Sequence, residues 1–389
     1  MTDIKKVIED MDLKGPPSNH RIVVAMSGGV DSSVTAAILV EAGFDVVGLT
    51  MQLYDHGKAL KKKGACCAGS DINDARLVAS KLEIPHYVLN YENLFKDQVM
   101  EDFADSYLRG ETPIPCIRCN QTVKFTDMVE RARQLGASAM ATGHYIRRKI
   151  YLGHPNLFKG LDETKDQSYF LFATTKNQLE FLRFPLGSLT KEETRIVARK
   201  HNLNVAEKPD SQDICFVPEG KYADVVRKLR PGNIEAGDII DVNGKILGKH
   251  NGIIDYTIGQ RKGLGIGGRK GIEDENSVLY VIALDSKNHN VIVGPRHFLA
   301  CDKIKISECN WIIKKPSEPQ LKVLVKLRNS SKPVSGIISI DSNNGLSELY
   351  FDQPQYGVST GQAAVFYNTE EYEHVLGGGW IADAPNMYV

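Results

Sequence analysis

Residues 21–33 read Arg21-Ile22-Val23-Val24-Ala25-Met26-Ser27-Gly28-Gly29-Val30-Asp31-Ser32-Ser33, and this stretch decides the fold of the first half of the chain. Its first part is a short continuous apolar run, which is typical of a strand buried on both faces of a parallel sheet. A glycine turn follows, and apolar residues then recur at helical spacing until Gly43. A second apolar run at residues 46–51 completes a βαβ unit.

Strand and helix patterns keep alternating after this unit, so we expect a Rossmann-like α/β domain with a parallel sheet. A proline-containing segment, Thr112 to Asn120, interrupts the pattern and is interpreted as an ordered loop. Beyond about residue 220 glycine is frequent and short β-rich runs replace helical periodicity. We predict a loose N-terminal extension, a catalytic α/β domain, a small glycine-rich middle domain and a β-barrel-like terminal domain, with bounds 1–19, 20–220, 221–298 and 299–389.

Composition places the chain among ordinary globular proteins. It has 389 residues, 42% of them apolar and 25% charged, and no apolar run approaches the roughly 20 residues that cross a bilayer. The first nine residues lack a secretory pattern, so we expect a cytoplasmic protein without a membrane partner and without disulfide staples. The formal net charge is zero, so charge alone does not indicate a nucleic-acid binder.

The segment Ser27-Gly28-Gly29-Val30-Asp31-Ser32-Ser33 predicts a phosphate site. Backbone N–H groups of a glycine turn and of a helix N-terminus point outward together, and the helix dipole adds partial positive charge. Asp31 is positioned to orient Mg²⁺ or a water near the phosphates. A tight turn with an Asp or Ser helix cap requires the same residue types and is the structural alternative. Neither G-x-x-x-x-G-K-[ST] nor G-x-G-x-x-G is present at this turn.

The turn resembles the pyrophosphate loop, S-G-G-x-D-S-S, of the ATP pyrophosphatase superfamily. That resemblance implies a loop that holds the β,γ-phosphates of ATP while a carbonyl oxygen of the substrate attacks the α-phosphate. A nucleophile then displaces AMP. The superfamily includes synthetases of small molecules and several tRNA-modifying enzymes.

Seven cysteines in such a chain point to thiol chemistry or metal binding. Cys116 and Cys119 lie in one segment, Cys215 follows Asp210-Ser211-Gln212-Asp213-Ile214, and each is a candidate sulfur nucleophile. Cys301 and Cys309 are expected to be small buried hydrophobes. Cys66 and Cys67 lie beside a lysine cluster, and their role stays open.

Seven motifs occur in the order found in the bacterial tRNA-specific 2-thiouridylase family, which this chain closely resembles. They are residues 25–33, Asn73-Asp74-Ala75-Arg76, Cys119-Asn120, Ala141-Thr142-Gly143-His144-Tyr145, Lys165-Asp166-Gln167-Ser168-Tyr169-Phe170, residues 211–215, and Gly259-Gln260-Arg261-Lys262-Gly263-Leu264-Gly265. The resemblance implies ATP-dependent thiolation of the wobble uridine, position 34, of tRNAs for Lys, Glu and Gln.

By this resemblance Cys119 matches the catalytic nucleophile and Cys215 the cysteine that carries a persulfide. A cysteine desulfurase or a sulfur relay protein would supply the sulfur. The expected products are AMP and pyrophosphate, with ATP and Mg²⁺ as cofactors and a Cys119–Cys215 disulfide after sulfur release.

Further positions match the family's ATP and tRNA contacts, and a structural hydrogen bond is the competing interpretation for each polar one. The implied ATP contacts are Ala25, Met26, Ser27, Gly28, Gly29, Val30, Asp31, Ser32, Ser33, Met51 and Gly143. The implied tRNA contacts are Ile114, Pro115, Cys116, His144, Lys165, Asp166, Gln167, Arg328 and Gln362, of which the first three correspond to the region beside the target base.

Two positions depart from the family pattern. Cys116 stands where an aspartate is commoner, so Cys116, Cys119 and Cys215 are also candidate ligands of an iron–sulfur cluster that would replace the persulfide. Asn329 stands where the family commonly has tyrosine after Arg328. Other open alternatives are a 4-thiouridine or lysidine synthetase, a small-molecule amide synthetase, and a non-catalytic tRNA-binding protein.

Overall fold

The computed structural model describes residues 4–53, 67–210, 214–217, 220–266, 278–340 and 345–388, and the apolar run after Arg21 is the middle strand of a parallel sheet. The five strands lie in the order β3-β2-β1-β4-β7. Val23 of β1 lies opposite Val47 of β2 on one side and Met140 of β4 on the other. The parallel α/β sheet predicted from the sequence is therefore confirmed. The strand bounds are β1 Arg21–Ala25, β2 Asp45–Gln52, β3 His86–Asn90, β4 Ala139–Ala141 and β7 Leu182–Arg183.

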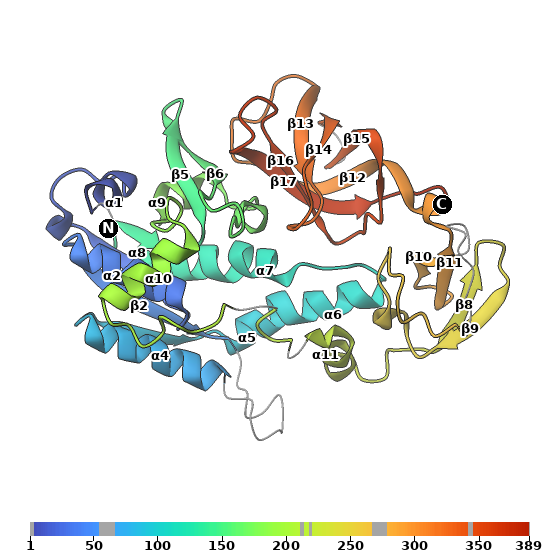
Figure 1. The fold of residues 1–389 in the computed structure, drawn as a ribbon, viewed down its shortest axis with the longest axis horizontal. Coiled ribbons are helices and arrows are strands. Elements are labelled where there is room, and N and C mark those ends of the chain that lie inside the picture. The colour runs from blue at the N-terminus through green and yellow to red at the C-terminus, as the bar shows by residue number, and fades with distance from the viewer. Residues whose placement is uncertain are drawn as a thin grey trace. The chain divides into compact units, whose positions relative to one another are not determined.

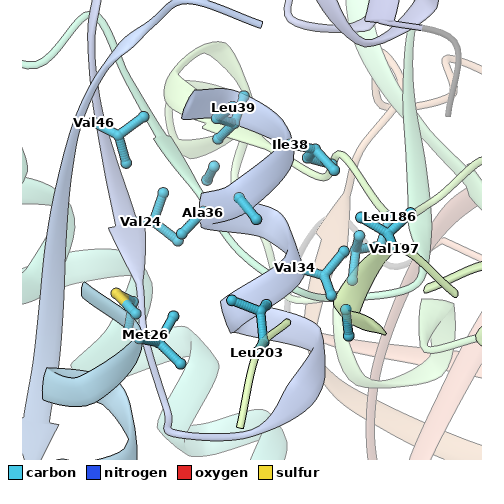
Figure 2. Close-up of a cluster of buried hydrophobic side chains, with 14 of the residues drawn as sticks. Val24, Met26, Val34, Ala36, Ile38, Leu39, Val46, Leu186, Val197 and Leu203 are labelled. Carbon is cyan, nitrogen blue, oxygen red and sulfur yellow. The ribbon is translucent and has the colours of Figure 1, made fainter. Parts of the chain in front are cut away.

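Helix α2 is buried along most of its length because it packs between the sheet and α10. Figure 2 shows Val34 and Ile38 of α2 pointing toward Leu186 and Val197, whereas Val24 of β1 lies on the opposite side of the helix. All five side chains belong to one buried cluster. This packing fixes the start of α2, and with it the glycine turn, at the end of β1. The helices of this region are α2 Val30–Glu41, α4 Cys67–Lys81, α5 Glu92–Phe95, α7 Pro115–Arg118, α8 Val129–Gln134, α9 Lys176–Phe181 and α10 Lys191–Lys200, with π-helical segments at Lys96–Met100 and Cys119–Met128 (Figure 1).

The N-terminal residues differ from the loose extension expected from the sequence. Residues Ile4–Asp10 form helix α1, and Val7 and Met11 are buried in the core that surrounds α2. The backbone carbonyl of Met11 also accepts a hydrogen bond from Arg183. The reason lies in the spacing of Ile4, Val7, Ile8 and Met11, which puts four apolar side chains on one helical face.

The segment Thr112 to Asn120 is also more regular than the expected loop. Helix α7 begins at Pro115, and a π-helical stretch, Cys119–Met128, continues directly from it. Proline at the first helical position needs no hydrogen-bond partner for its nitrogen, so it favours a helix start here. Cys119 therefore lies on a helix and not in a loop.

Contacts between residues divide the chain into two compact units. The first contains the parallel sheet and comprises Met1–Val99, Cys116–Gln212 and Glu373–Val375, and the second comprises Met100–Pro115, Asp213–Tyr372 and Leu376–Val389. A hairpin of β5 Ile146–Tyr151 and β6 His154–Lys159 belongs to the first unit, where β6 pairs with His374 and Val375. The first unit thus includes a short segment, Glu373–Val375, that lies far away in the sequence.

In the second unit, α6 Glu101–Leu108 packs against α11 Tyr222–Leu229, and Phe103 makes an edge contact with Phe216. A four-stranded sheet follows in the order β10-β11-β8-β9. Its strands are β8 Gly237–Asp241, β9 Ile246–His250, β10 Tyr280–Asp285 and β11 Asn290–Gly294.

The terminal strands form an antiparallel barrel in the order β12-β15-β14-β13-β16-β17, which closes because β12 also pairs with β17. Its interior is apolar, and the buried Cys301 lies in it, as the sequence predicted for that cysteine. The β-barrel-like terminal domain is confirmed. The strands are β12 Ala300–Trp311, β13 Gln320–Lys326, β14 Val334–Ser339, β15 Leu346–Tyr356, β16 Ala363–Tyr367 and β17 His374–Asp383.

Candidate functional site

The turn between β1 and α2 has a shape that only glycine permits at Gly28. Its φ of +76° is left-handed, and a Cβ at this position would lie 2.0 Å from the backbone oxygen of Asp71. Within the turn, the Ser32 hydroxyl accepts a 3.0 Å hydrogen bond from the backbone N–H of Ser27, and the Ser33 hydroxyl donates a 2.8 Å bond to the carbonyl of Gly29. The serines thus fix the backbone at the N-terminus of α2, where N–H groups lack intrahelical partners.

Asp31 stands in the first turn of α2 and has strong partners. Lys191 Nζ lies 2.7 Å and 2.9 Å from its two carboxylate oxygens, and the Tyr145 hydroxyl donates a 2.8 Å bond to one of them. Burial, followed by the charge of Asp31, raises the pKa of Tyr145, so this phenol stays protonated and acts as a donor.

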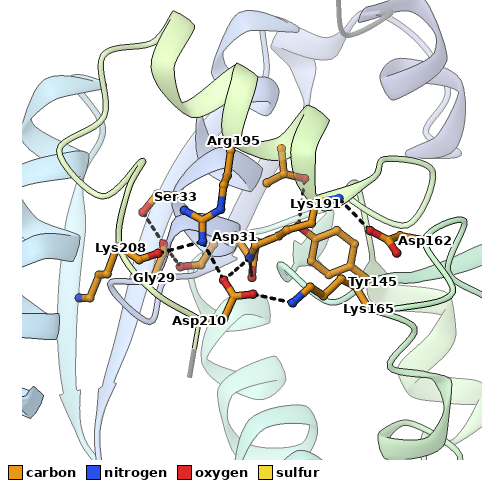
Figure 3. A network of polar contacts seen from close by, with 12 residues as sticks. Gly29, Asp31, Ser33, Tyr145, Asp162, Lys165, Lys191, Arg195, Lys208 and Asp210 are labelled. Carbon is orange, nitrogen blue, oxygen red and sulfur yellow. Dashed lines mark hydrogen bonds and ion pairs between the residues drawn. The ribbon is translucent and has the colours of Figure 1, made fainter. Parts of the chain in front are cut away.

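A second carboxylate, Asp210, continues the network on the other side of Lys191 (Figure 3). It pairs with Lys191 at 2.8 Å, Lys165 at 2.7 Å and Arg195 at 3.1 Å. Burial raises the pKa of Asp210, but hydrogen bonds from Lys165 and Lys191 outweigh burial and lower it to about 2. Three cations therefore surround one ionised carboxylate next to the loop.

Lys208 fastens the loop to α4. Its ammonium donates to the carbonyl of Gly28 at 2.9 Å and to the carboxylates of Asp71 and Asp74 at 2.7 Å and 2.6 Å. This contact assigns a structural role to Asp74 of the Asn73-Asp74-Ala75-Arg76 motif, because Asp74 is one of the two carboxylates that bind Lys208. Four cations, Lys165, Lys191, Arg195 and Lys208, thus lie around the loop, and they are paired with four carboxylates, Asp31, Asp71, Asp74 and Asp210.

Gly143 supports the loop from β4. A Cβ on Gly143 would come within 2.8 Å of backbone atoms of Asp31 and Ser32, so the chain can approach α2 this closely only without a side chain. The position predicted from the family resemblance thus contacts the loop. Met51 lies partly buried near the end of β2, a strand that neighbours β1.

Sequence reasoning missed Lys191, Arg195, Lys208 and Asp210. A local signal existed only for the helix: Thr190 and Glu193 form a capping box that starts α10 and makes Lys191 its first residue. Nothing in the local sequence says that this helix start faces Asp31, because α10 lies 160 residues further along the chain.

The predicted tRNA residues 165–167 have structural partners in the first unit. Asp166 is buried and accepts bonds from the backbone of Gly160 and from both the backbone and hydroxyl of Ser168. The side chain of Gln167 accepts a 3.0 Å bond from the backbone of Tyr145. The competing structural interpretation thus has direct support at these two positions, while Lys165 belongs to the Asp210 network.

The cysteines of interest fall in different units. Cys116 is exposed and Cys119 partly buried on the α7 helix and the π-helical segment after it, whereas Cys215 is exposed in the second unit. Burial raises the pKa of the Cys119 thiol, and the positive charge of Lys124 opposes that rise. Cys119 is thus held as a neutral thiol near pH 7. Two parts of the predicted thiol chemistry lie outside the described residues: Cys66, and residues 211–213 of the motif that ends in Cys215.

His144 lies beside the same helical segment. Its ring nitrogen is 2.8 Å from the Thr142 hydroxyl, and Phe125 and Phe184 make edge contacts with the ring. Burial, with a smaller contribution from Lys124, lowers the pKa of His144 well below 6.5. The imidazole is therefore neutral at pH 7 and offers hydrogen bonds and stacking, not charge.

Two predicted tRNA residues, Arg328 and Gln362, line one cavity of about 410 Å³ in the second unit. Gln362 donates a 2.7 Å bond to the carbonyl of Thr112, and Arg328 donates to the carbonyl of Gly357. Ser359 lines the same cavity, and within the described residues its buried hydroxyl has no partner. The rest of the described lining is Thr112, Thr257, Ile258, Gly259 and Gln260, so the cavity offers several donors, and none of its described lining residues carries a carboxylate.

Among the described residues, no three His, Cys, Asp or Glu side chains are grouped as metal ligands would be. Cys116 and Cys119 therefore have no third potential metal ligand beside them among the described residues. The helices in the described part of the chain are all too short or too polar to cross a membrane.

Comparison with known proteins assigns the family. The family described as "tRNA methyl transferase HUP domain" matches residues 20–219, the "tRNA methyl transferase PRC-barrel domain" matches 225–295, and the "Aminomethyltransferase beta-barrel domain" matches 301–381. A tRNA-specific 2-thiouridylase MnmA of Rhodospirillum centenum is 56% identical over 95% of this chain and 93% of its own length. The chain belongs to the tRNA-specific 2-thiouridylase family.

Other members match over nearly their whole length. The tRNA-specific 2-thiouridylase MnmA of Roseobacter denitrificans is 53% identical over 97% of this chain and 98% of its own. A solved complex of a 4-thiouridine synthetase with RNA and bound ATP aligns with 55% of this chain and 52% of its own at 15% identity and a TM-score of 0.35. In this 2-thiouridylase-family chain, the Ser27–Ser33 loop lies within the first of the three matched regions.

Proposed function

We propose that this chain uses ATP to replace the C2 oxygen of the wobble uridine, position 34 of tRNAs for Lys, Glu and Gln, with sulfur. The observation that carries the proposal is the family membership along almost the entire chain, since the relatives at 52–56% identity are named tRNA-specific 2-thiouridylases. The loop geometry supports it, because the N-terminus of α2 offers a glycine turn with backbone N–H donors, and cations paired with carboxylates lie beside it. We place this activity in the cytoplasm.

In the first half-reaction, the β,γ-phosphates lie on the Ser27–Ser33 loop and the C2 oxygen of the uridine attacks the α-phosphorus. The bond from the α-phosphorus to the bridging oxygen breaks, and pyrophosphate leaves. Lys165 and Arg195 stabilise the negative charge on the phosphates, and Mg²⁺ held with the help of Asp31 would add to that stabilisation. The adenylated oxygen is then a good leaving group.

In the second half-reaction, the Cys119 thiol loses its proton to solvent, and the thiolate attacks the inner sulfur of a persulfide on Cys215. A Cys119–Cys215 disulfide forms, and hydrosulfide is released toward C2 of the uridine. The hydrosulfide adds to C2, AMP leaves with the former C2 oxygen, and one proton is lost. A dithiol reductant returns both cysteines to thiols, and a cysteine desulfurase or a sulfur relay protein reloads Cys215.

The wobble base must leave the anticodon stack before either step, since C2 is inaccessible in a stacked base. We assign Ile114, Pro115 and Cys116 to the surroundings of the flipped base and His144 to a neutral contact with the RNA. Arg328 and the cavity around it suit the RNA backbone, because the described residues that line the cavity offer a guanidinium and amide donors and include no acidic residue.

The test is mass spectrometry of tRNA nucleosides from cells that lack the gene and carry plasmid copies. The wild-type gene should restore wobble 2-thiouridine, while Cys119→Ser and Cys215→Ser should not, although both variants should still bind ATP. Cys309→Ser serves as the matched control because Cys309 packs against the barrel core. Full 2-thiouridine in cells without the gene would overturn the proposal.

Anaerobic purification followed by iron and sulfide analysis separates the two sulfur routes. Stoichiometric iron and sulfide that disappear in a Cys116→Asp variant would favour a cluster on Cys116, Cys119 and Cys215. Iron-free enzyme that thiolates tRNA from a persulfide donor would support the route written above.

A further inference from the structure

Lys191 occupies an unusual position in the loop network. Its ammonium contacts both oxygens of Asp31 and one oxygen of Asp210, all within 2.9 Å, and its side chain is only 12% exposed. It also lies 5.7 Å above the centre of the Tyr145 ring. Figure 3 shows the side chain reaching from the start of α10 into the space between the two aspartates.

The contacts match the chemistry of an ammonium group. A lysine ammonium has three donors, and here three carboxylate oxygens lie in reach of it. One oxygen of Asp31 also accepts the Tyr145 hydroxyl, so both of its lone pairs are used. Both carboxylate oxygens of Asp31 are therefore engaged by its own protein, while the second oxygen, with Lys191 as its printed partner, keeps one lone pair for a metal.

A metal ion at Asp31 has to compete with this lysine. Mg²⁺ binds carboxylate oxygens at about 2.0–2.1 Å and repels a second cation on the same oxygens. Asp210 does not need Lys191 to remain balanced, because Lys165 and Arg195 also pair with it. A cation that displaces Lys191 from Asp31 thus frees a positive charge beside the phosphate loop.

We propose that Lys191 prevents free Mg²⁺ from binding to Asp31. When the metal–nucleotide complex binds, the Lys191 ammonium leaves Asp31 and binds phosphate oxygens of ATP. Lys191 is then a phosphate-binding residue that exchanges one anion for another. The metal binds only together with the nucleotide, because the negatively charged phosphates then bind the ammonium that has left Asp31. This inference rests on the proposed ATP site. It goes beyond that proposal because it states that the metal binds only together with the nucleotide.

The experiment uses the full-length protein and two probes, Mn²⁺ alone followed by electron paramagnetic resonance, and MgATP followed by calorimetry. Wild type should bind MgATP well and Mn²⁺ alone weakly. Lys191→Met should bind Mn²⁺ alone at least about tenfold more tightly and MgATP about ten- to a hundredfold more weakly, since a charge-assisted hydrogen bond to a phosphate is lost. The two affinities thus move in opposite directions, which simple misfolding does not produce.

Lys200→Met is the matched control, because Lys200 lies on the same helix and pairs with Glu41 away from the loop. It should leave both affinities unchanged. Lys191→Arg keeps the charge, so it should keep Mn²⁺ excluded and retain more MgATP binding than Lys191→Met. Thermal melting of each variant checks that it is folded.

An unchanged Mn²⁺ affinity in folded Lys191→Met, or an unchanged MgATP affinity, would overturn the inference and leave the proposed function intact. Wild-type protein that does not bind MgATP at all would instead overturn the proposed ATP site, and this inference with it.

Discussion

The Tyr145 hydroxyl and Asp31 are joined by a 2.8 Å hydrogen bond, although 114 residues separate them in the chain. Tyr145 follows β4 and Asp31 lies in the first turn of α2, which follows β1, so the bond links the segments that come after two neighbouring strands. A phenol whose pKa is raised by burial donates steadily to this carboxylate. Asp31 is thereby kept in one orientation.

Tyr145→Phe should weaken the site without dismantling the fold. It removes one hydrogen bond to a charged acceptor, which corresponds to about 1.5–3 kcal/mol. We expect tRNA-dependent pyrophosphate release to fall about ten- to a hundredfold. Tyr151→Phe, on the partly exposed β5–β6 hairpin, is the control and should be silent. A rate equal to wild type for Tyr145→Phe would show that this bond does not matter for adenylation.

Gly28→Ala should abolish ATP binding. The added methyl group would meet the backbone oxygen of Asp71, so the loop must move away from α4 and from the Lys208 contact. Gly136→Ala is the control for backbone strain, because Gly136 has a similar φ of +72° and open space around its Cβ position. Calorimetry should show normal MgATP binding for Gly136→Ala and no binding for Gly28→Ala. The strain at positive φ should lower the free energy of unfolding of Gly136→Ala by about 1 kcal/mol.

Alkylation of Cys119 should depend on pH in a direction fixed by its surroundings. Burial raises the pKa of this thiol, so the reactive thiolate should appear only above neutral pH. Lys124 opposes the rise, hence Lys124→Met should move the alkylation curve to still higher pH. Mass spectrometry of iodoacetamide-treated protein measures the curve, with the exposed Lys176→Met as control. A shift to lower pH in Lys124→Met would contradict the assigned electrostatics.

His144 and Arg328 should differ in the salt dependence of tRNA binding. His144 has a pKa well below 6.5, so at pH 7 it carries no charge and releases no counterions. Arg328→Gln should therefore reduce the slope of log K against log salt by about 1, whereas His144→Gln should weaken binding without changing the slope. Titrations of labelled tRNA at several salt concentrations measure both. Equal slope changes would place a charge on His144.

The contribution of the Asp210 ion pairs to the stability of the folded protein should be lost at acid pH. The folded pKa of Asp210 is lowered to about 2 from 3.8, so its stabilising effect is present above pH 3.8 and is lost as the pH falls through about 2. Wild type should lose urea resistance across that window. Asp210→Asn should start lower at pH 6 and lose less between pH 4 and 2. The exposed Asp302→Asn should follow wild type, and parallel curves for all three proteins would contradict this role.

The sequence by itself determined the parallel α/β sheet and the phosphate turn, because both follow from local patterns. A short apolar run followed by a glycine turn is typical of a buried strand, and the helical spacing of apolar residues after the turn indicates the helix that became α2. The order of motifs was enough to indicate the family, since each motif is a few contiguous residues.

Only the tertiary structure decided which distant side chains join the loop. Lys191, Arg195, Lys208 and Asp210 carry no local signal, because a surface lysine and a site lysine look alike until α10 is packed against α2. The N-terminal helix went unrecognised for a related reason: a single helical face of four apolar residues becomes stable only when a core receives it. Local spacing fixes secondary structure, whereas charge partners depend on how the chain folds back on itself.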